Sequence, residues 1–377
     1  MDPIEFRRHL HKYPELSFEE YATARYISAA LTELGVEHRA IATTGILAKI
    51  EGRGDLTQAV VLRADIDALP VKEQTELPFK SQNEGVMHAC GHDFHAAILY
   101  GVVAKLQETK DFEGTIFAIF QPGEERNPGG ASYVLAEEPF KDYNVKAVVG
   151  QHVEITLPVG TLGFRAGKYM ASSDEIRFNV NGVGGHGAMR QKIKDPVQAA
   201  AAFTLELLAL NSEDLVLSIG KVEADGATNV IPAKVYLEGT MRTFDEAIRA
   251  ATKEQLTTIA KQIEKKYDGC NVDVNISHGF PCVVNDKALT EAAIEEAKTK
   301  SIDTVALDLR TTSEDFGFYT TCYPSLFYRL GAGEITTEKN NNNSSVGAPH
   351  TSTFCPNEGA ITVGIDFMLS IARKIAK

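Results

Sequence analysis

The chain has 377 residues, a formal net charge of -13, 44% hydrophobic residues and 24% charged residues. This composition is typical of a soluble globular protein, and the length exceeds what one hydrophobic core usually holds, so two domains are expected. The acidic balance argues against nucleic acid and anionic membranes as partners, because both are bound through basic surfaces.

Neither a membrane span nor a secretion signal is expected. Charges interrupt the apolar runs before they reach the roughly 18 residues of a transmembrane helix, and the N-terminal stretch MDPIEFRRHL has no apolar core of a signal peptide. The five cysteines are scattered and odd in number, which is not the pattern of a disulfide framework. A reducing cytoplasm is therefore the expected location.

The first part of the chain predicts helices that alternate with buried strands. The Ser-x-x-Glu pattern at 17–20 is typical of a capping box and predicts a helix over 17–34 that ends at Gly35. Continuous apolar strands alternating with helices predict an α/β fold with a mostly parallel sheet flanked by helices. The further elements expected here are strands at 45–51, 58–66, 115–121 and 146–151 and an apolar helix at 92–107.

The pattern changes near residue 168. Two-residue alternation replaces the continuous apolar strands, and the expected order becomes strand, helix, strand, strand, helix, strand, which is typical of a ferredoxin-like βαββαβ unit. The elements of this unit are predicted at 174–180, 195–211, 215–223, 233–243, 245–268 and 270–276.

Helical and buried-strand patterns of the first kind then return, at 286–299, 325–331 and 357–376, with a polar loop at 339–347. The economical interpretation is an insertion. One catalytic α/β domain is expected from 1–167 and 277–377, and a smaller α+β domain, 168–276, interrupts it.

The stretch MHACGHDFH at 87–95 raises the question of a metal site. Cys90 and His92 are two residues apart, so an extended chain entering a helix could aim both at one point. Thiolate and imidazole are good ligands for zinc and similar ions. The alternative is that these residues are capping and core groups of a helix start.

Polar residues after other predicted strands favour the metal site. Glu124 and Glu125 follow the buried strand at 115–121, and His152 follows the next strand. Adjacent glutamates after a core strand are costly unless a positive charge is near, although alone they could be a surface pair. Asp65 and Asp67 end another strand, where one or both could orient a liganding imidazole. In α/β sheets ligands bind at the carboxyl ends of strands, where these residues coincide.

Several motifs occur together in a recognisable order. These are HKYPELSFEE, LRADIDALP, MHACGHDFH, QPGEE, GVGGHGAM, TNVIP, EGTMRT, SEDF and PHTSTF. The set resembles the aminoacylase/carboxypeptidase family of co-catalytic metallohydrolases, in the amidohydrolase branch that includes hippurate hydrolases, indole-acetyl-amino-acid hydrolases and N-acetyldiaminopimelate deacetylases. The resemblance implies a catalytic domain like that of zinc aminopeptidases.

The resemblance also implies roles for individual residues. Glu124 matches the general base, and His186, Asn229 and Arg242 match groups that contact the substrate's carbonyl and carboxylate. In some relatives this histidine reaches the active site of the partner subunit, so a homodimer through the inserted domain is implied. The five residues that match the ligands of two divalent ions are Cys90, His92, Glu125, His152 and His350. The expected ions are zinc or manganese, with cobalt or nickel as alternatives.

The activity that follows is hydrolysis of the amide bond of a small N-acyl amino acid, by a water that the two ions activate and Glu124 deprotonates. Two alternatives remain open. The same site could serve a dipeptidase or aminopeptidase, or the chain could bind amino-acid-like ligands without turning them over.

Overall fold

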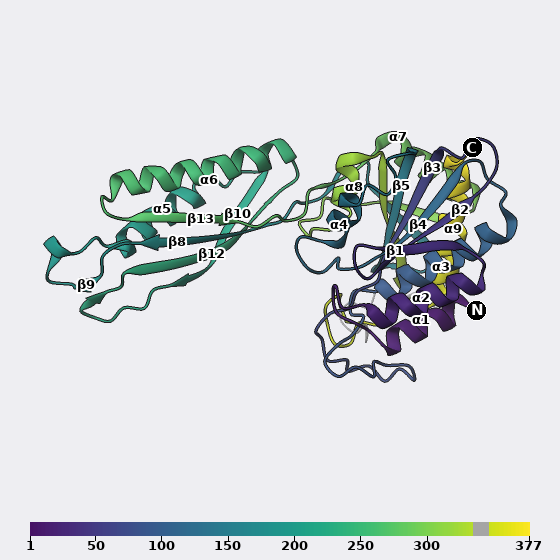
Figure 1. The fold of residues 1–377 in the computed structure, drawn as a ribbon, viewed down its shortest axis with the longest axis horizontal. Helices are drawn as coiled ribbons and strands as arrows, with labels where there is room; N and C mark the ends of the chain where they lie inside the picture. The colour runs from purple at the N-terminus through teal and green to yellow at the C-terminus, as the bar shows by residue number, and fades with distance from the viewer. Residues whose placement is uncertain (335–346) are drawn as a thin grey trace. The chain divides into compact units, whose positions relative to one another are not determined.

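The computed structural model describes residues 1–334 and 347–377, and the described chain forms two compact units (Figure 1). The larger unit comprises Met1–Gly167, Val284–Asp308 and Phe318–Lys377, and the smaller comprises Lys168–Val283 and Leu309–Gly317. The smaller unit thus extends past the boundary expected at 276 and takes in a second segment. Backbone bridges between Ser173 and Phe280 and between Met170 and Arg310 account for the difference.

The larger unit contains an eight-stranded sheet in the order β1-β2-β4-β3-β5-β16-β6-β15. The pairs β3–β4, β3–β5, β5–β16 and β6–β15 are parallel, which confirms the predicted α/β fold. The remaining pairs are antiparallel. The strands are β1 (Glu37–Ile41), β2 (Gly45–Glu51), β3 (Gln58–Asp65), β4 (Thr115–Gln121), β5 (Asn144–Pro158), β6 (Thr161–Phe164), β15 (Asp303–Ala306) and β16 (Ser325–Gly333).

Alternate residues of each strand point to opposite faces of this sheet, so each face presents side chains for packing. Val60 and Leu62 of β3 join a continuous core with α1, α2, α3 and α9, whereas Phe117 of β4 packs against Phe140 and Tyr143. The helices are α1 (Pro3–Lys12), α2 (Tyr21–Glu33), α3 (His92–Thr109), α4 (Gly130–Ala136), α7 (Lys287–Thr299), α8 (Gly317–Cys322) and α9 (Gly359–Ile375).

The predicted capping box at the start of α2 is wrong. The helix begins at Tyr21, and Phe18 has φ +65°, which turns the chain out of the helical path. The Glu15 carboxylate caps the helix instead, accepting hydrogen bonds from Ala22 N at 3.1 Å and Thr23 N at 2.7 Å. The side chains of Ser17 and Glu20 are therefore left for other contacts.

The smaller unit has the predicted βαββαβ order, with the antiparallel sheet β10-β12-β8-β13. Asp195 and Asp245 cap its two helices. Its main elements are β8 (Asp174–Asn181), α5 (Pro196–Leu208), β10 (Leu215–Glu223), β12 (Lys234–Thr243), α6 (Glu246–Lys266) and β13 (Asn271–Ile276). Shorter elements are β7 (Gly167–Met170) and β14 (Val283–Asn285), where the chain passes between units, with β9 (Gly185–His186), β11 (Val230–Ile231) and the 3-10 turn Arg190–Lys192.

Residues 339–346 of the expected polar loop lie outside the described residues. Across the described ranges, none of the helices combines the length and the apolar character that crossing a bilayer requires.

Candidate metal centre

Two expected ligands, Cys90 and His92, flank a glycine where the chain enters α3. Gly91 has φ +88°, a backbone conformation that favours glycine, and a Cβ on it would lie 2.4 Å from Val153 Cγ2. The chain can therefore pass beneath β5 at this point only with a glycine. Both flanking side chains are buried, with Cys90 8% and His92 1% exposed.

Glu125 and His152 reach the same place from neighbouring strands. Glu125 follows the end of β4, and its backbone N–H donates to Asp67 Oδ2 at 2.9 Å. His152 lies within β5, just past Gly150, the last residue of this strand that pairs with β3. The strand predicted at 146–151 is longer than expected because β16 continues to pair with β5 beyond that point.

His350, the fifth expected ligand, comes from the segment before α9. Its backbone N–H donates to Ala89 O at 2.8 Å, and its φ of +67° is unusual for a residue with a side chain. Its Nε2 lies 3.2 Å from Glu125 Oε1. Its side chain is 54% exposed, so His350 stands on the open side of the group.

These side chains form two groups that share Cys90. One group joins Cys90 with His92 and His152, and the other joins Cys90 with Glu125 and His350. Within each group the possible ligand atoms all lie within 4.8 Å of one another. A further group places Glu124 with His92 and Glu125. The structure thus brings together the five expected ligands and the expected base.

In two histidines of the site Nδ1 makes the hydrogen bond to an oxygen, so Nε2 is the nitrogen whose lone pair can bind a metal. His92 Nδ1 lies 2.9 Å from Asp67 O and 3.0 Å from Asp67 Oδ1, and His152 Nδ1 lies 2.7 Å from Val153 O. A carbonyl or carboxylate oxygen only accepts, so both Nδ1 atoms carry the proton. Among the described residues, His92 Nε2 is buried without a hydrogen-bond partner. Such an orphaned imidazole nitrogen, next to thiol and carboxylate, fits a divalent metal ion.

Asp67 connects three segments of the site. Its Oδ1 accepts from His92, and its Oδ2 accepts from Ser17 Oγ at 2.7 Å as well as from Glu125 N. Although burial raises the pKa of Asp67, these hydrogen bonds hold it below its usual value. A fully buried carboxylate with three donors can fix the ring of His92 and the backbone of Glu125 at once.

A second carboxylate, Asp65, lies beneath the site. His95 Nδ1 is 2.5 Å from Asp65 Oδ1, and His95 Nε2 accepts a 3.0 Å hydrogen bond from Val153 N, next to His152. Arg63 Nη1 donates to Asp65 Oδ2 at 2.7 Å. Although burial raises the pKa of Asp65, the charge of His92, followed by the interactions with His95 and Arg63, holds it well below its usual value.

Two other residues of the histidine-rich stretch, Asp93 and His88, lie beside residues of α1. Asp93 accepts from Arg7 Nε at 2.7 Å and lies 2.9 Å from His11 Nδ1. His88 is buried, and burial lowers its pKa to about 4. These residues join α1 to the start of α3.

The electrostatics of the ligand groups favour positive charge. Hydrogen bonds with Cys90 and Glu125 raise the pKa of His350 to about 10. Although burial lowers the pKa of His92, the charge of Asp65 raises it well above its usual value. Burial, followed by the charge of Glu125, raises the pKa of the Cys90 thiol. A bound divalent cation would supply the positive charge that these groups otherwise obtain from protons.

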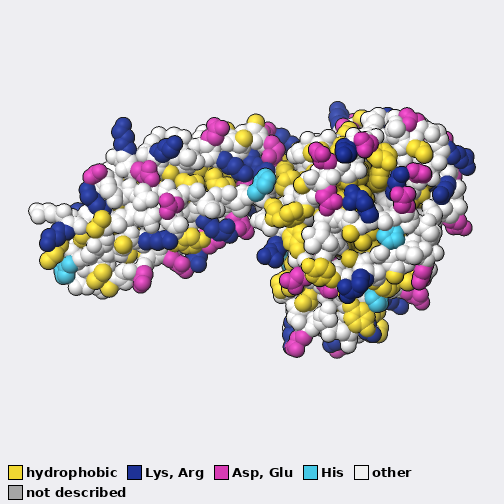
Figure 2. Space-filling model, viewed as in Figure 1, with side chains coloured by type: hydrophobic (Ala, Val, Ile, Leu, Met, Phe, Trp, Pro, Cys, Tyr) yellow, Lys and Arg dark blue, Asp and Glu magenta, His cyan; other side chains and the backbone are white. Residues whose placement is uncertain are grey.

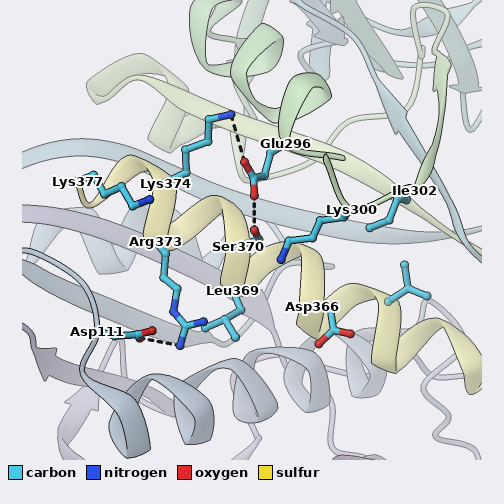
Figure 3. A pocket seen from close by; sticks show the side chains of 11 residues that line it. Asp111, Glu296, Lys300, Ile302, Asp366, Leu369, Ser370, Arg373, Lys374 and Lys377 are labelled. Carbon is cyan, nitrogen blue, oxygen red and sulfur yellow. Dashed lines mark hydrogen bonds and ion pairs between the residues drawn. The ribbon is translucent and has the colours of Figure 1, made fainter. Parts of the chain in front are cut away.

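A hollow elsewhere in the larger unit has a different character (Figure 3). It has a volume of about 770 Å³ and lies along α7 and α9. Arg373 Nη2 lies 2.7 Å from Asp111 Oδ1, and Lys374 Nζ lies 3.2 Å from Glu296 Oε2, as the dashed lines show. In these ion pairs the charges neutralise one another. We therefore interpret the hollow as space left where helices pack, and not as a ligand site.

The other expected site residues lie in the smaller unit. His186 is exposed in β9, paired with Val230 of β11, and Gly187 N donates to Asn229 O at 2.9 Å, so His186 and Asn229 are neighbours. Arg242 is near the far end of β12, and its Nη1 donates to Thr311 O at 2.9 Å. Arg242 is eight positions along β12 from Lys234, the first residue of the strand, a span of roughly 26 Å.

Two side-chain contacts near the site were not predicted from the sequence. Ser17 and Glu20 were expected in a capping box, but Ser17 binds Asp67 and Glu20 binds the backbone of Gly123, next to Glu124. The residues that make these contacts lie in the stretch PELSFEE, which carries three glutamates and a serine beside a phenylalanine. That pattern also fits a helix start, and only the three-dimensional contacts separate the two interpretations.

Comparisons with known proteins agree with this fold. Residues 61–373 match peptidase family M20/M25/M40. The chain belongs to this family and is therefore a hydrolase. It is 36% identical over 378 residues to N-acetylcysteine deacetylase of Bacillus subtilis, covering 98% of this chain and 95% of the relative.

Two further relatives extend the likeness. The chain is 35% identical over 378 residues to N-acetyldiaminopimelate deacetylase of Oceanobacillus iheyensis, covering 97% of each. A solved structure from Bacillus subtilis, described as a dinuclear metal-binding peptidase of the M20 family, superposes with a TM-score of 0.84 at 34% identity. The match covers 99% of this chain and 97% of that one.

Proposed function

We propose that the chain hydrolyses the amide bond of small N-acyl amino acids, such as N-acetyl or N-benzoyl amino acids, with two divalent metal ions. The observation that carries the proposal is the pair of ligand groups that share Cys90, with Glu124 beside them. The substrate class is supported by the relatives that are named as deacetylases of N-acetylcysteine and N-acetyldiaminopimelate.

The proposed metal-binding residues are the five expected ligands. His92 and His152 would hold one ion and Glu125 and His350 the other, with Cys90 available to both. When bound, the ions supply Lewis acidity that polarises the substrate carbonyl and lowers the pKa of water. The thiolate favours zinc, whereas the carboxylate also admits manganese, and cobalt or nickel remain candidates.

Glu124 is proposed as the general base. Its side chain is buried, with Oε2 3.9 Å from His92 Nε2, so it stands next to the ligands without being needed as one. It would take a proton from the water whose oxygen bonds to the carbonyl carbon. When the carbon–nitrogen bond breaks, Glu124 would pass that proton to the leaving nitrogen. The products are the carboxylate of the acyl group and a free amino acid.

Three residues of the smaller unit are proposed as substrate contacts. His186 and Asn229 are exposed, so their polar atoms can meet a ligand, and His186 would stabilise the oxyanion of the tetrahedral intermediate. Arg242 uses one of its N–H groups on Thr311 O and keeps others for a substrate carboxylate.

A homodimer through the smaller unit is proposed as the assembly. Strand β10 is at the edge of its sheet and presents Val216 and Val222, which are 53% and 62% exposed, and Leu205 of α5 is 71% exposed. Exposed apolar residues along an open strand edge favour pairing with another chain. Leu205→Lys with Val222→Lys should convert a dimer into a monomer in sedimentation equilibrium. A wild-type monomer would contradict the proposal.

The other expected partners and the location also remain proposals. Figure 2 shows acidic and basic side chains interspersed over each unit on the face in view, which supports the absence of a nucleic acid or membrane partner. All five cysteines are free, which supports a reducing cytoplasm.

The experiment that tests the function is a substrate panel. Metal-free protein is loaded in turn with zinc, manganese, cobalt and nickel, and each form is assayed on N-acetyl and N-benzoyl amino acids and on dipeptides with a free amino group. Preferential turnover of the N-acyl amino acids supports the proposal. Preferential turnover of dipeptides would assign a dipeptidase or aminopeptidase, and metal and ligand binding without any turnover would assign a binding protein.

A further inference from the structure

The stretch Glu15–Glu20 contacts, at several points, the residues that support the proposed metal site. Ala68 N donates to Glu15 O at 2.8 Å, and Ser17 donates to Asp67. The ring of Phe18 lies against Gly123, where a Cβ would be 2.4 Å from Phe18 Cζ. These contacts reach both the end of β3 and the turn after β4, which carries Glu124.

Glu20 makes the most direct contact with that turn. Its side chain is fully buried, its Oε1 accepts from Gly123 N at 2.9 Å, and its Oε2 accepts from Thr44 Oγ1 at 2.5 Å. Gly123 has φ +63°, so the turn depends on a backbone conformation that needs outside support. A buried carboxylate on the N–H of the residue directly before Glu124 supplies that support.

We propose that Glu20 is a positioning residue for Glu124, which it holds in place through the backbone N–H of Gly123. The inference rests on the proposed role of Glu124 as the base. Small displacements of a base reduce the rate steeply, because proton transfer requires hydrogen-bond distance. Glu20 itself touches neither the substrate nor the expected metal ligands.

The charge of Glu20 depends on pH in the range where the enzyme would work. Burial and then the negative charge of Asp67 raise the pKa of Glu20 to about 7. From the end of β3 Asp67 faces it, from the turn after β4 Glu124 follows Gly123, and the turn between β1 and β2 contributes the uncharged Thr44. An ionised acceptor binds the Gly123 N–H more strongly than a neutral one, so Glu20 should hold the turn more firmly above pH 7.

The kinetic test compares Glu20→Ala and Glu20→Gln with Glu19→Ala, an exposed neighbour that serves as the matched control. Glu20→Ala should lower kcat on an N-acetyl amino acid by at least about tenfold, with KM and metal content unchanged. Glu20→Gln keeps an acceptor without the charge, so its kcat should match the wild type below pH 6 and fall several-fold short only above pH 7. Wild-type kcat in Glu20→Ala, or equal losses of metal and kcat, would overturn the proposal.

A second measurement does not depend on activity. In protein labelled with ¹⁵N-glycine, one amide signal should shift with pH near 7 in the wild type and not in Glu20→Gln. If the two proteins show the same set of titrating glycine signals, the contact does not act as proposed. An inactive wild type that still shows this difference would count against the proposed function, and leave the contact between Glu20 and Gly123 supported.

Discussion

Cys90 Sγ lies 3.3 Å from His152 Nε2, although 62 positions separate the two residues in the chain. The thiol comes from the entry to α3 and the imidazole from β5, so their proximity is a product of the fold. Because Cys90 also belongs to the group with Glu125 and His350, it is the one side chain common to both ligand groups.

Replacing Cys90 should therefore affect both proposed ions. In Cys90→Ala the metal content after dialysis should fall well below the wild-type value, because each proposed ion would lose one of its expected ligands. Elemental analysis measures this directly, and Cys322→Ala, at an exposed cysteine, is the control. Unchanged stoichiometry in Cys90→Ala would show that the thiol is not a ligand.

Gly91→Ala should destabilise the protein for two separable reasons. A side chain at φ +88° costs about 1–2 kcal/mol of strain, and the clash with Val153 adds roughly 1–3 kcal/mol. Gly160→Ala is the matched control, since Gly160 has φ +90° with no heavy atom within 4 Å of its added Cβ. Urea unfolding should show the larger loss for Gly91→Ala. Equal losses would mean that the approach of Val153 has no energetic consequence.

The raised pKa of Glu20 predicts how the stability of the protein depends on pH. Its pKa is raised in the folded protein to about 7, against 4.5 for the free side chain. Between these values the folded state binds the proton more tightly, so stability falls as pH rises from 4.5 to 7, by about 3 kcal/mol in total. Glu20→Gln removes this loss. The variant should therefore gain stability relative to the wild type at pH 8 but not at pH 4, as denaturant unfolding at the two pH values would show. A pH-independent difference would contradict the raised pKa.

The structural features that depend on local residue patterns and on the order of motifs could be predicted from the sequence. Strand 45–51 is β2 at the predicted residues, because a buried strand is a short continuous apolar run. The five expected ligands and Glu124 meet in one place, as the strand-end argument and the family resemblance indicate.

The supporting contacts could not be predicted, because they depend on distant segments. Glu20 follows Ser17 at the spacing of a capping box, yet its carboxylate binds Gly123, 103 positions away. The positive φ of Phe18 that redirects the chain is stabilised by contacts of its ring with the turn after β4 and with Tyr133. Likewise, the reach of β5 to Pro158 follows from its pairing with β16, late in the chain.

Glu124 is proposed to move the proton in the hydrolysis of an N-acyl amino acid. Its most direct test is kcat for the best N-acetyl amino acid, measured for the wild type and Glu124→Gln at equal metal content. Glu124→Gln should bind metal as the wild type does and lose kcat by roughly a hundredfold or more, because general base catalysis contributes about that factor to the rate. Turnover in Glu124→Gln at the wild-type rate, with both ions bound, would contradict it.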